Sequence, residues 1–135
     1  MSKKIDEIEG IGPAYAAKLV EAGINTVERL LEVAGTKAER TALAETTGIP
    51  EANILRWVNH ADLFRINGVA SQFAELLEAS GVDSVPELAQ RNAANLAAKM
   101  SEVNEAKNLS NRAPSESEVT RWIEEAKTLG RAVHH

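Results

Sequence analysis

One short stretch near the N-terminus has the residue types and spacing to bind a ligand. Residues 8–19 read I-E-G-I-G-P-A-Y-A-A-K-L. Gly10 and Gly12 flank Ile11, which is typical of a tight turn, and Pro13 suits the first turn of a helix because its missing N–H would have no partner there. The remaining amides of a helix N-terminus beside a bare glycine surface can hold a phosphate or carboxylate oxygen. The stretch therefore predicts an anion-binding turn, with close packing of two helices as the alternative explanation for its glycines.

Catalytic and metal-binding motifs are not recognisable elsewhere in the sequence. It contains no phosphate-binding loop of the G-x-x-x-x-G-K-[ST] kind, no G-x-S-x-G elbow and no H-E-x-x-H pattern. The absence of cysteine excludes disulfides, thiolate nucleophiles and cysteine-based zinc sites. His60 stands alone, and we expect it to be solvated or to cap a helix. We therefore expect no enzyme activity, no cofactor and no side-chain metal site.

The composition is that of an ordinary soluble globular protein. The chain has 135 residues, of which 44% are hydrophobic and 26% charged. This length allows one core or two small lobes that share an interface, and one compact body is the simpler expectation. No apolar run reaches membrane-spanning length, and the N-terminus lacks the apolar stretch of a signal peptide. We expect a cytoplasmic protein without a membrane partner.

The charge balance limits any interaction with nucleic acid. The net charge is −5, and both halves are acidic, with seven basic and ten acidic residues up to Leu63 and eight and ten after it. Proteins that bind nucleic acid through phosphates usually present a basic face. Binding of that kind would need a local patch that works against an unfavourable overall field.

The sequence contains an internal repeat. Gly10–Leu30 matches Gly68–Leu88 at an offset of 58, and Ile54–Ala61 matches Val119–Ala126 at an offset of 65. Self-similarity of this kind is the mark of a duplicated structural unit. Apolar residues in the second pair of blocks recur at i, i+3, i+4 and i+7, the stripe of an amphipathic helix that faces a core. We therefore predict an all-α fold built from two copies of one unit, packed as one compact body.

The two copies are expected to cover residues 1–63 and 64–135. Gly23 and Gly81 suit the left-handed position just past the end of a helix. Ser or Thr is expected to cap the helices that follow, in three cases with Glu three residues later as a capping box. These caps are Thr26, Thr36 with Glu39, Ser84 with Glu87, and Ser115 with Glu118. Trp57 and Trp122 fall on the apolar stripes, which favours core anchors over base-stacking platforms.

The run I-E-G-I-G-P-A-Y-A-A-K-L, followed by E-A-G-I-N-T-V-E-R-L, resembles the helix-hairpin-helix motif of many DNA-repair and recombination proteins. The whole chain, including W-V-N-H-A-D-L-F-R-I and R-W-I-E-E-A-K, resembles a bacterial family of tandem helix-hairpin-helix proteins classed as a domain of unknown function. In DNA-binding members the hairpin amides contact phosphate oxygens of one strand, sometimes with a monovalent cation held by hairpin carbonyls. The resemblance thus implies sequence-independent contact with the nucleic-acid backbone.

Carried over to this sequence, the resemblance implicates the amides of Gly10, Gly12 and Ala14. It places a cation near the carbonyls of Ile8 and Ile11, so that Ile11 belongs to the same candidate site. DNA-binding hairpins often have Lys or Arg at the position of Ala14.

The nearest basic residue along the expected helix is instead Lys18, which completes the candidate set. In the second copy Ala70 replaces the second glycine, so that hairpin is degenerate and expected to be structural. Arg56 and Arg121 recur beside the tryptophans, and we interpret this recurrence as a shared structural role.

Two functions remain open from the sequence. The first is a non-catalytic binding module that contacts nucleic-acid backbone through the turn between Gly10 and Gly12. The second is a protein-protein interaction or scaffold module that keeps the fold and does not bind nucleic acid, which the acidic balance and the degenerate second hairpin favour. Fold alone does not decide between them.

Overall fold

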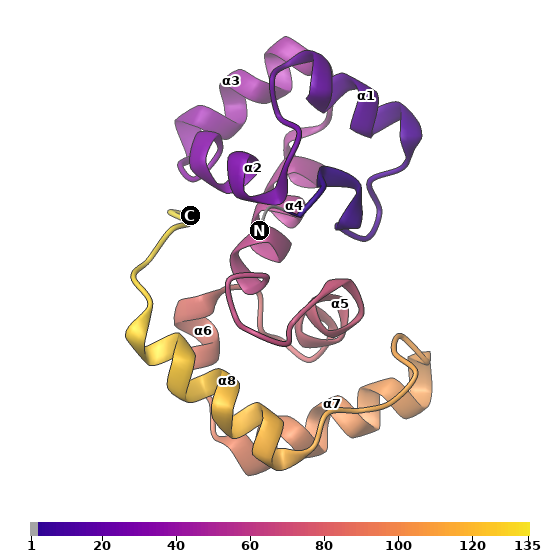
Figure 1. Ribbon diagram of the computed structural model, residues 1–135, viewed down its shortest axis with the longest axis vertical. Coiled ribbons are helices and arrows are strands. Elements are labelled where there is room, and N and C mark those ends of the chain that lie inside the picture. The colour runs from indigo at the N-terminus through magenta and orange to yellow at the C-terminus, as the bar shows by residue number, and fades with distance from the viewer. Residues whose placement is uncertain (1–2) are drawn as a thin grey trace. The chain divides into compact units, whose positions relative to one another are not determined.

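The computed structural model describes residues 3–135 and is all-helical over that range (Figure 1). It contains eight α-helices and one short 3-10 helix, with no strand in the described part of the chain. A single isolated bridge joins Lys4 to Thr26. The predicted all-α class is therefore confirmed.

The chain divides into two units. Unit 1 comprises Met1–Asp62 and Ala132–His135, and unit 2 comprises Leu63–Arg131. The elements of unit 1 are η1 (Ile5–Glu7), α1 (Pro13–Glu21), α2 (Val27–Val33), α3 (Lys37–Thr47) and α4 (Glu51–Leu63), the last ending on the first residue of unit 2. The elements of unit 2 are α5 (Ser71–Ala79), α6 (Val85–Ala89), α7 (Ala93–Lys107) and α8 (Glu116–Thr128).

Most of the predicted helix signals operate as expected. Thr26 Oγ1 accepts a hydrogen bond from the Arg29 amide at 3.0 Å, and Thr36 forms a reciprocal capping box with Glu39. The glycines after α1 and α5 have φ values of 88° and 95° at Gly23 and Gly81. Because side chains rarely adopt this left-handed conformation, glycine ends these helices at low cost.

One predicted capping box is wrong. Ser84 occupies the N-cap of α6, but its side chain accepts no capping hydrogen bond. Glu87 instead pairs with Arg91, whose Nε lies 3.1 Å from Glu87 Oε1. The competing cation one helical turn further on therefore takes the carboxylate that a capping box needs.

Each unit has a tryptophan in its core, as predicted. Trp57 is 2% exposed and packs against Tyr15 with ring centroids 5.2 Å apart. Trp122 is also 2% exposed and packs against Phe73 at the same centroid distance. These tilted and edge-on arrangements are the ones that aromatic pairs prefer.

The expectation for His60 is wrong, because this side chain is fully buried. Residues 57–62, which form the end of α4 within unit 1, are all buried, so burial there is not confined to one face of the helix. The polar residues Asn59 and Asp62 lie in the same buried run. A helical stripe predicts burial on one face only, which is why the sequence pattern missed His60.

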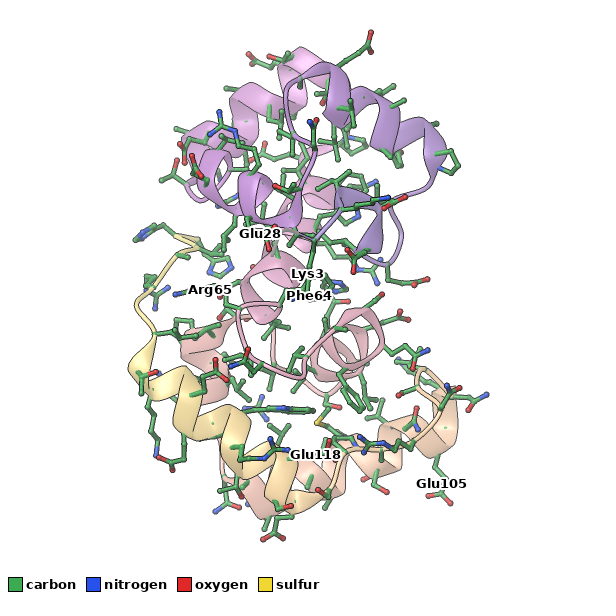
Figure 2. The ribbon with its side chains drawn as sticks, viewed as in Figure 1. Lys3, Glu28, Phe64, Arg65, Glu105 and Glu118 are labelled. Carbon is green, nitrogen blue, oxygen red and sulfur yellow. The ribbon has the colours of Figure 1, made fainter. Side chains whose placement is uncertain are left out.

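Glu118 lies in the first turn of α8 in unit 2 (Figure 2), where it forms an ion pair with Arg112. Arg112 donates to both carboxylate oxygens of Glu118, at 2.7 Å and 2.9 Å. The Ser115 amide also donates to Glu118 and completes the predicted capping box. The hydrogen bond from Arg112, reinforced by the Ser115 amide, lowers the pKa of Glu118 to about 2.

Candidate ligand-binding turn

The candidate turn joins η1 to α1 and is anchored to the core by two buried isoleucines. Ile8 and Ile11 are 1% and 6% exposed, and the Ile11 amide donates to the Ile8 carbonyl at 3.2 Å. Gly10 and Gly12 are both exposed. Burial of the isoleucines therefore turns the intervening glycine backbone toward solvent.

Gly10 is required by the backbone conformation of the turn. Its φ is +94°, in the region that side chains rarely adopt. A methyl group built on Gly10 would lie 3.7 Å from Trp57 Nε1 and 3.8 Å from Arg56 Nη1, which are ordinary contact distances. The positive φ, and not a lack of space, therefore accounts for glycine at this position.

Gly12 differs from Gly10, because neither its backbone conformation nor the space around it requires a glycine. Its φ of −81° and ψ of 177° are open to any residue, and no atom lies within 4 Å of an added methyl group. Ala70, which precedes α5 as the N-cap, has a comparable extended conformation. The bare backbone at Gly12 is thus a surface feature with no packing role.

The amides that follow Gly12 have no acceptor within their own helix. The first hydrogen bond of α1 runs from the Ala16 amide to the Gly12 carbonyl at 2.9 Å, and Pro13 has no N–H. The amides of Ala14 and Tyr15 precede that bond, so they belong to the unpaired first turn of the helix. Ala14 is exposed. An anion of small size can therefore approach these donors from solvent.

Charges of both signs surround the turn. The guanidinium of Arg56, an exposed residue of α4, lies beside Gly10. Asp6, Glu7 and Glu9 are exposed in the residues that lead into the turn. Glu7 is engaged by the backbone of η1, since its Oε2 accepts from the Lys4 amide at 2.8 Å. The cation beside the turn thus acts within a partly acidic surrounding.

The corresponding turn of unit 2 is chemically different. Gly68 has a φ of 90° and packs close to Trp122, whose Nε1 would lie 3.4 Å from an added methyl group. The Asn67 amide donates to Glu125 Oε1 at 3.0 Å. This carboxylate occupies a donor of the turn and places a negative charge there, which disfavours an anion.

The structure brings four of the five predicted site residues together. Gly10, Ile11, Gly12 and Ala14 form one continuous turn, in which Ile11 supplies main chain because its side chain is buried. Lys18 instead lies in the last turn of α1, where it lines a cavity with Glu21 and Thr47.

Sequence reasoning missed Arg56 as a neighbour of the turn. Its recurrence as Arg121, each time directly before a tryptophan, was the available signal. That recurrence indicated a shared position, but only the packing of Trp57 and Arg56 against Gly10 shows where the charge lies. The cation beside the turn is therefore Arg56 of α4, whereas the sequence alone pointed only to Lys18.

The described residues thus define an all-helical protein with an exposed glycine turn. No helix among them combines the length and apolar character needed to cross a membrane, and no group of three or more His, Asp or Glu side chains is placed to hold a metal ion. The chain belongs to the DUF4332 family, a domain of unknown function, whose model matches residues 9–129. The chain matches no curated protein and no solved structure.

Proposed function

We propose that this protein is a non-catalytic binding module whose first turn contacts nucleic-acid backbone without reading base sequence. Gly12 is the observation that carries the proposal, since it is an exposed glycine that neither backbone conformation nor packing requires, at the N-cap of a helix with unpaired amides. Close helix packing explains a glycine only where an added methyl group would collide. A ligand that approaches the main chain explains a glycine at an open position.

We further propose that the two units are copies of one helix-hairpin-helix unit. The aromatic pairs of both units have the same centroid separation of 5.2 Å. The glycines of the two turns, Gly10 and Gly68, have φ values of 94° and 90°. Such correspondence in backbone and core supports duplication of the unit.

In the proposed complex the amides of Gly12 and Ala14 donate to phosphate oxygens, and Arg56 adds a charge beside Gly10. Contacts of this kind position a protein on the backbone and carry no base information. Because one or two cations near the turn would neutralise phosphates, the logarithm of affinity should fall with log salt with a slope of about −1 to −2. The overall acidic charge keeps the association weak.

A fluorescence anisotropy titration with a labelled DNA duplex at low ionic strength tests the proposal. Gly12→Glu should abolish binding, because a carboxylate would sit beside the amides that receive the phosphate. Gly12→Gln separates the effect of side-chain volume from that of charge. Ala70→Glu is the matched control in unit 2 and should leave binding unchanged. Equal binding by the wild type and Gly12→Glu would rule out the turn as the contact.

The alternative function is protein-protein interaction without nucleic-acid binding. The exposed carboxylates of Asp6, Glu7 and Glu9 before the turn favour it, because they repel phosphate. A wild-type chain that fails to bind duplex or single-stranded DNA even at low salt, and that recovers one defined protein in stoichiometric amount, would establish this alternative.

A further inference from the structure

A short extended segment docks in unit 1, far in sequence from the helices that it contacts. Residues Ala132–His135, here called the docked segment, belong to unit 1 although they follow α8. Val133 is 1% exposed, whereas His134 and His135 are exposed. One aliphatic side chain of the segment is therefore buried and the two that follow face solvent.

Both main-chain polar groups of His134 in the docked segment, the amide and the carbonyl, form hydrogen bonds. The His134 amide donates to the Gly35 carbonyl at 2.7 Å. Arg40 Nη2 donates to the His134 carbonyl at 2.8 Å. Recognition through main-chain groups plus a buried alternate side chain is the way in which proteins bind extended peptides.

Gly35 makes room for this segment. A methyl group on Gly35 would lie 2.7 Å from the Ala132 carbonyl oxygen, closer than real side chains approach. The next neighbour, the Leu31 carbonyl oxygen, would be 3.3 Å away. The identity of residue 35 is thus set mainly by the segment docked against it, because without the segment only the Leu31 contact would be tight.

Arg40 depends on the docked segment for one of its acceptors. This side chain is 2% exposed, and it donates to the carbonyls of Ala34 and Gly35 at 3.2 Å and 3.0 Å in addition to that of His134. Within residues 3–135 no carboxylate pairs with Arg40. A buried guanidinium needs hydrogen-bond acceptors, so an emptied channel would favour another occupant that supplies a carbonyl.

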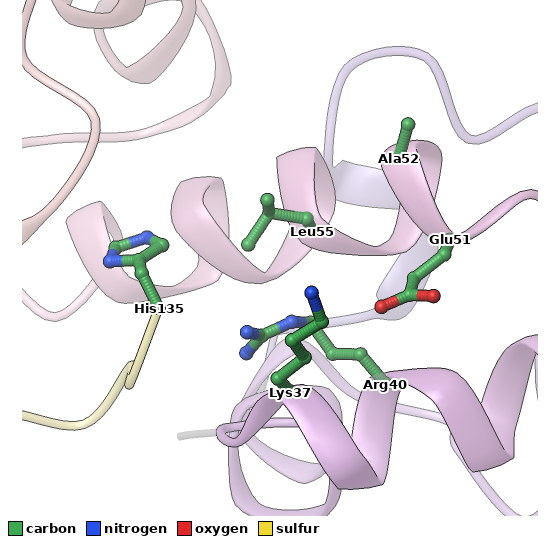
Figure 3. Close-up of a pocket in the computed structure, with 6 residues that line it drawn as sticks. All are labelled: Lys37, Arg40, Glu51, Ala52, Leu55 and His135. Atoms are coloured by element: carbon green, nitrogen blue, oxygen red, sulfur yellow. The ribbon is translucent and has the colours of Figure 1, made fainter.

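The end of the docked segment opens into a cavity. His135 Nε2 lies at hydrogen-bonding distance, 2.9 Å, from Asn59 Oδ1. His135 lines a cavity of about 310 Å³. Figure 3 shows His135 at one end of it, Glu51 toward the other end, and Lys37 beside Arg40 between them. The cavity therefore adjoins the docked segment at His135.

We propose that the channel formed by Gly35, Arg40 and Asn59 is a docking site for extended main chain, which residues 132–135 fill within the chain. We further propose that a second copy of the chain is its partner and donates the same segment. The sequence seated in the channel is one that every copy carries, and Gly130, just before it, is exposed with no atom within 4 Å of an added methyl group. Exchange of an identical element between copies is a low-cost route to a dimer.

Complementary full-length variants test this proposal. Val133→Asp removes the buried aliphatic side chain, so this chain can accept a segment but cannot donate one. Gly35→Ala blocks the channel, so this chain can donate but cannot accept. Analytical ultracentrifugation should show each variant alone as a monomer and their equimolar mixture as a dimer. The wild type should dimerise more weakly than the mixture, because its own segment competes at high effective concentration.

A mixture that sediments like its separate components, with both variants folded by circular dichroism, would overturn the proposal. Should Val133→Asp not fold, His134→Pro replaces it as the chain that can accept a segment but cannot donate one, because proline lacks the amide that donates to the Gly35 carbonyl. As an independent readout, the synthetic peptide Gly-Arg-Ala-Val-His-His should bind the acceptor variant at least tenfold more tightly than the same variant carrying Gly35→Ala. Equal affinity for both chains would also overturn it.

Discussion

The contrast between Gly10→Ala and Gly12→Ala separates a structural glycine from one that serves a ligand. At Gly10 the φ of +94° forces alanine into a left-handed conformation, which costs about 1–2 kcal/mol. At Gly12 the backbone is extended and the space is open. There alanine gains about 0.4–1 kcal/mol by restricting the unfolded chain, and it loses a similar amount as a poorer N-cap than glycine. We expect the free energy of unfolding to change by less than about 0.5 kcal/mol at Gly12.

Urea denaturation followed by tryptophan fluorescence measures both changes, since Trp57 lies beside Gly10. For a chain of this length a loss of 1 kcal/mol lowers Tm by about 4 °C, so thermal unfolding gives a second readout. DNA binding should be weakened more by Gly12→Ala than by Gly10→Ala, the reverse of the order expected for stability, because a methyl group at Gly12 intrudes on the amides. If Gly12→Ala destabilises as much as Gly10→Ala, Gly12 is structural and the argument for a ligand surface fails.

Three further outcomes follow from the packing. Glu118→Gln should destabilise unit 2 at neutral pH. The difference in unfolding free energy between this variant and the wild type should vanish as pH falls from about 4.5 to about 2, because the stability that comes from the lowered pKa of Glu118 is present above this window and is lost across it. Acid titrations of unfolding measure this difference. Thr26→Ala should cost about 1 kcal/mol, whereas Ser84→Ala should change urea midpoints little because Ser84 makes no capping bond. Trp57→Ala should cost about 3–5 kcal/mol in the same assay.

The all-α class and most helix boundaries follow from local signals in the sequence. Pro13 begins α1, Thr36 caps α3 and Gly48, with a φ of 75°, ends it, since each of these residues acts on its own backbone. His60 and Ser84 were mispredicted for a common reason: burial and the choice of hydrogen-bond partner depend on residues elsewhere in the fold. Signals that act on their own stretch of backbone can be predicted from the sequence, whereas burial and competition between hydrogen-bond partners cannot.

The candidate site shows the same division. The glycine turn was predictable, because its conformation and its unpaired amides arise within a few consecutive residues. The position of Arg56 beside Gly10 depends on the packing of α4 against the turn. The docking of Ala132–His135 against Gly35 joins residues almost a hundred positions apart, and no motif marks it.

The two turns have similar backbones and opposite chemistry, and this asymmetry bears directly on function. Unit 1 combines an open glycine at position 12 with a guanidinium near Gly10, whereas unit 2 has alanine at position 70 and a carboxylate bonded to the Asn67 amide. Both differences in unit 2 act against an anion, one by volume and one by charge. The open glycine of unit 1 and the unengaged amides beside it are therefore the features that support the proposed contact with an anion, and the turn of unit 2 lacks both.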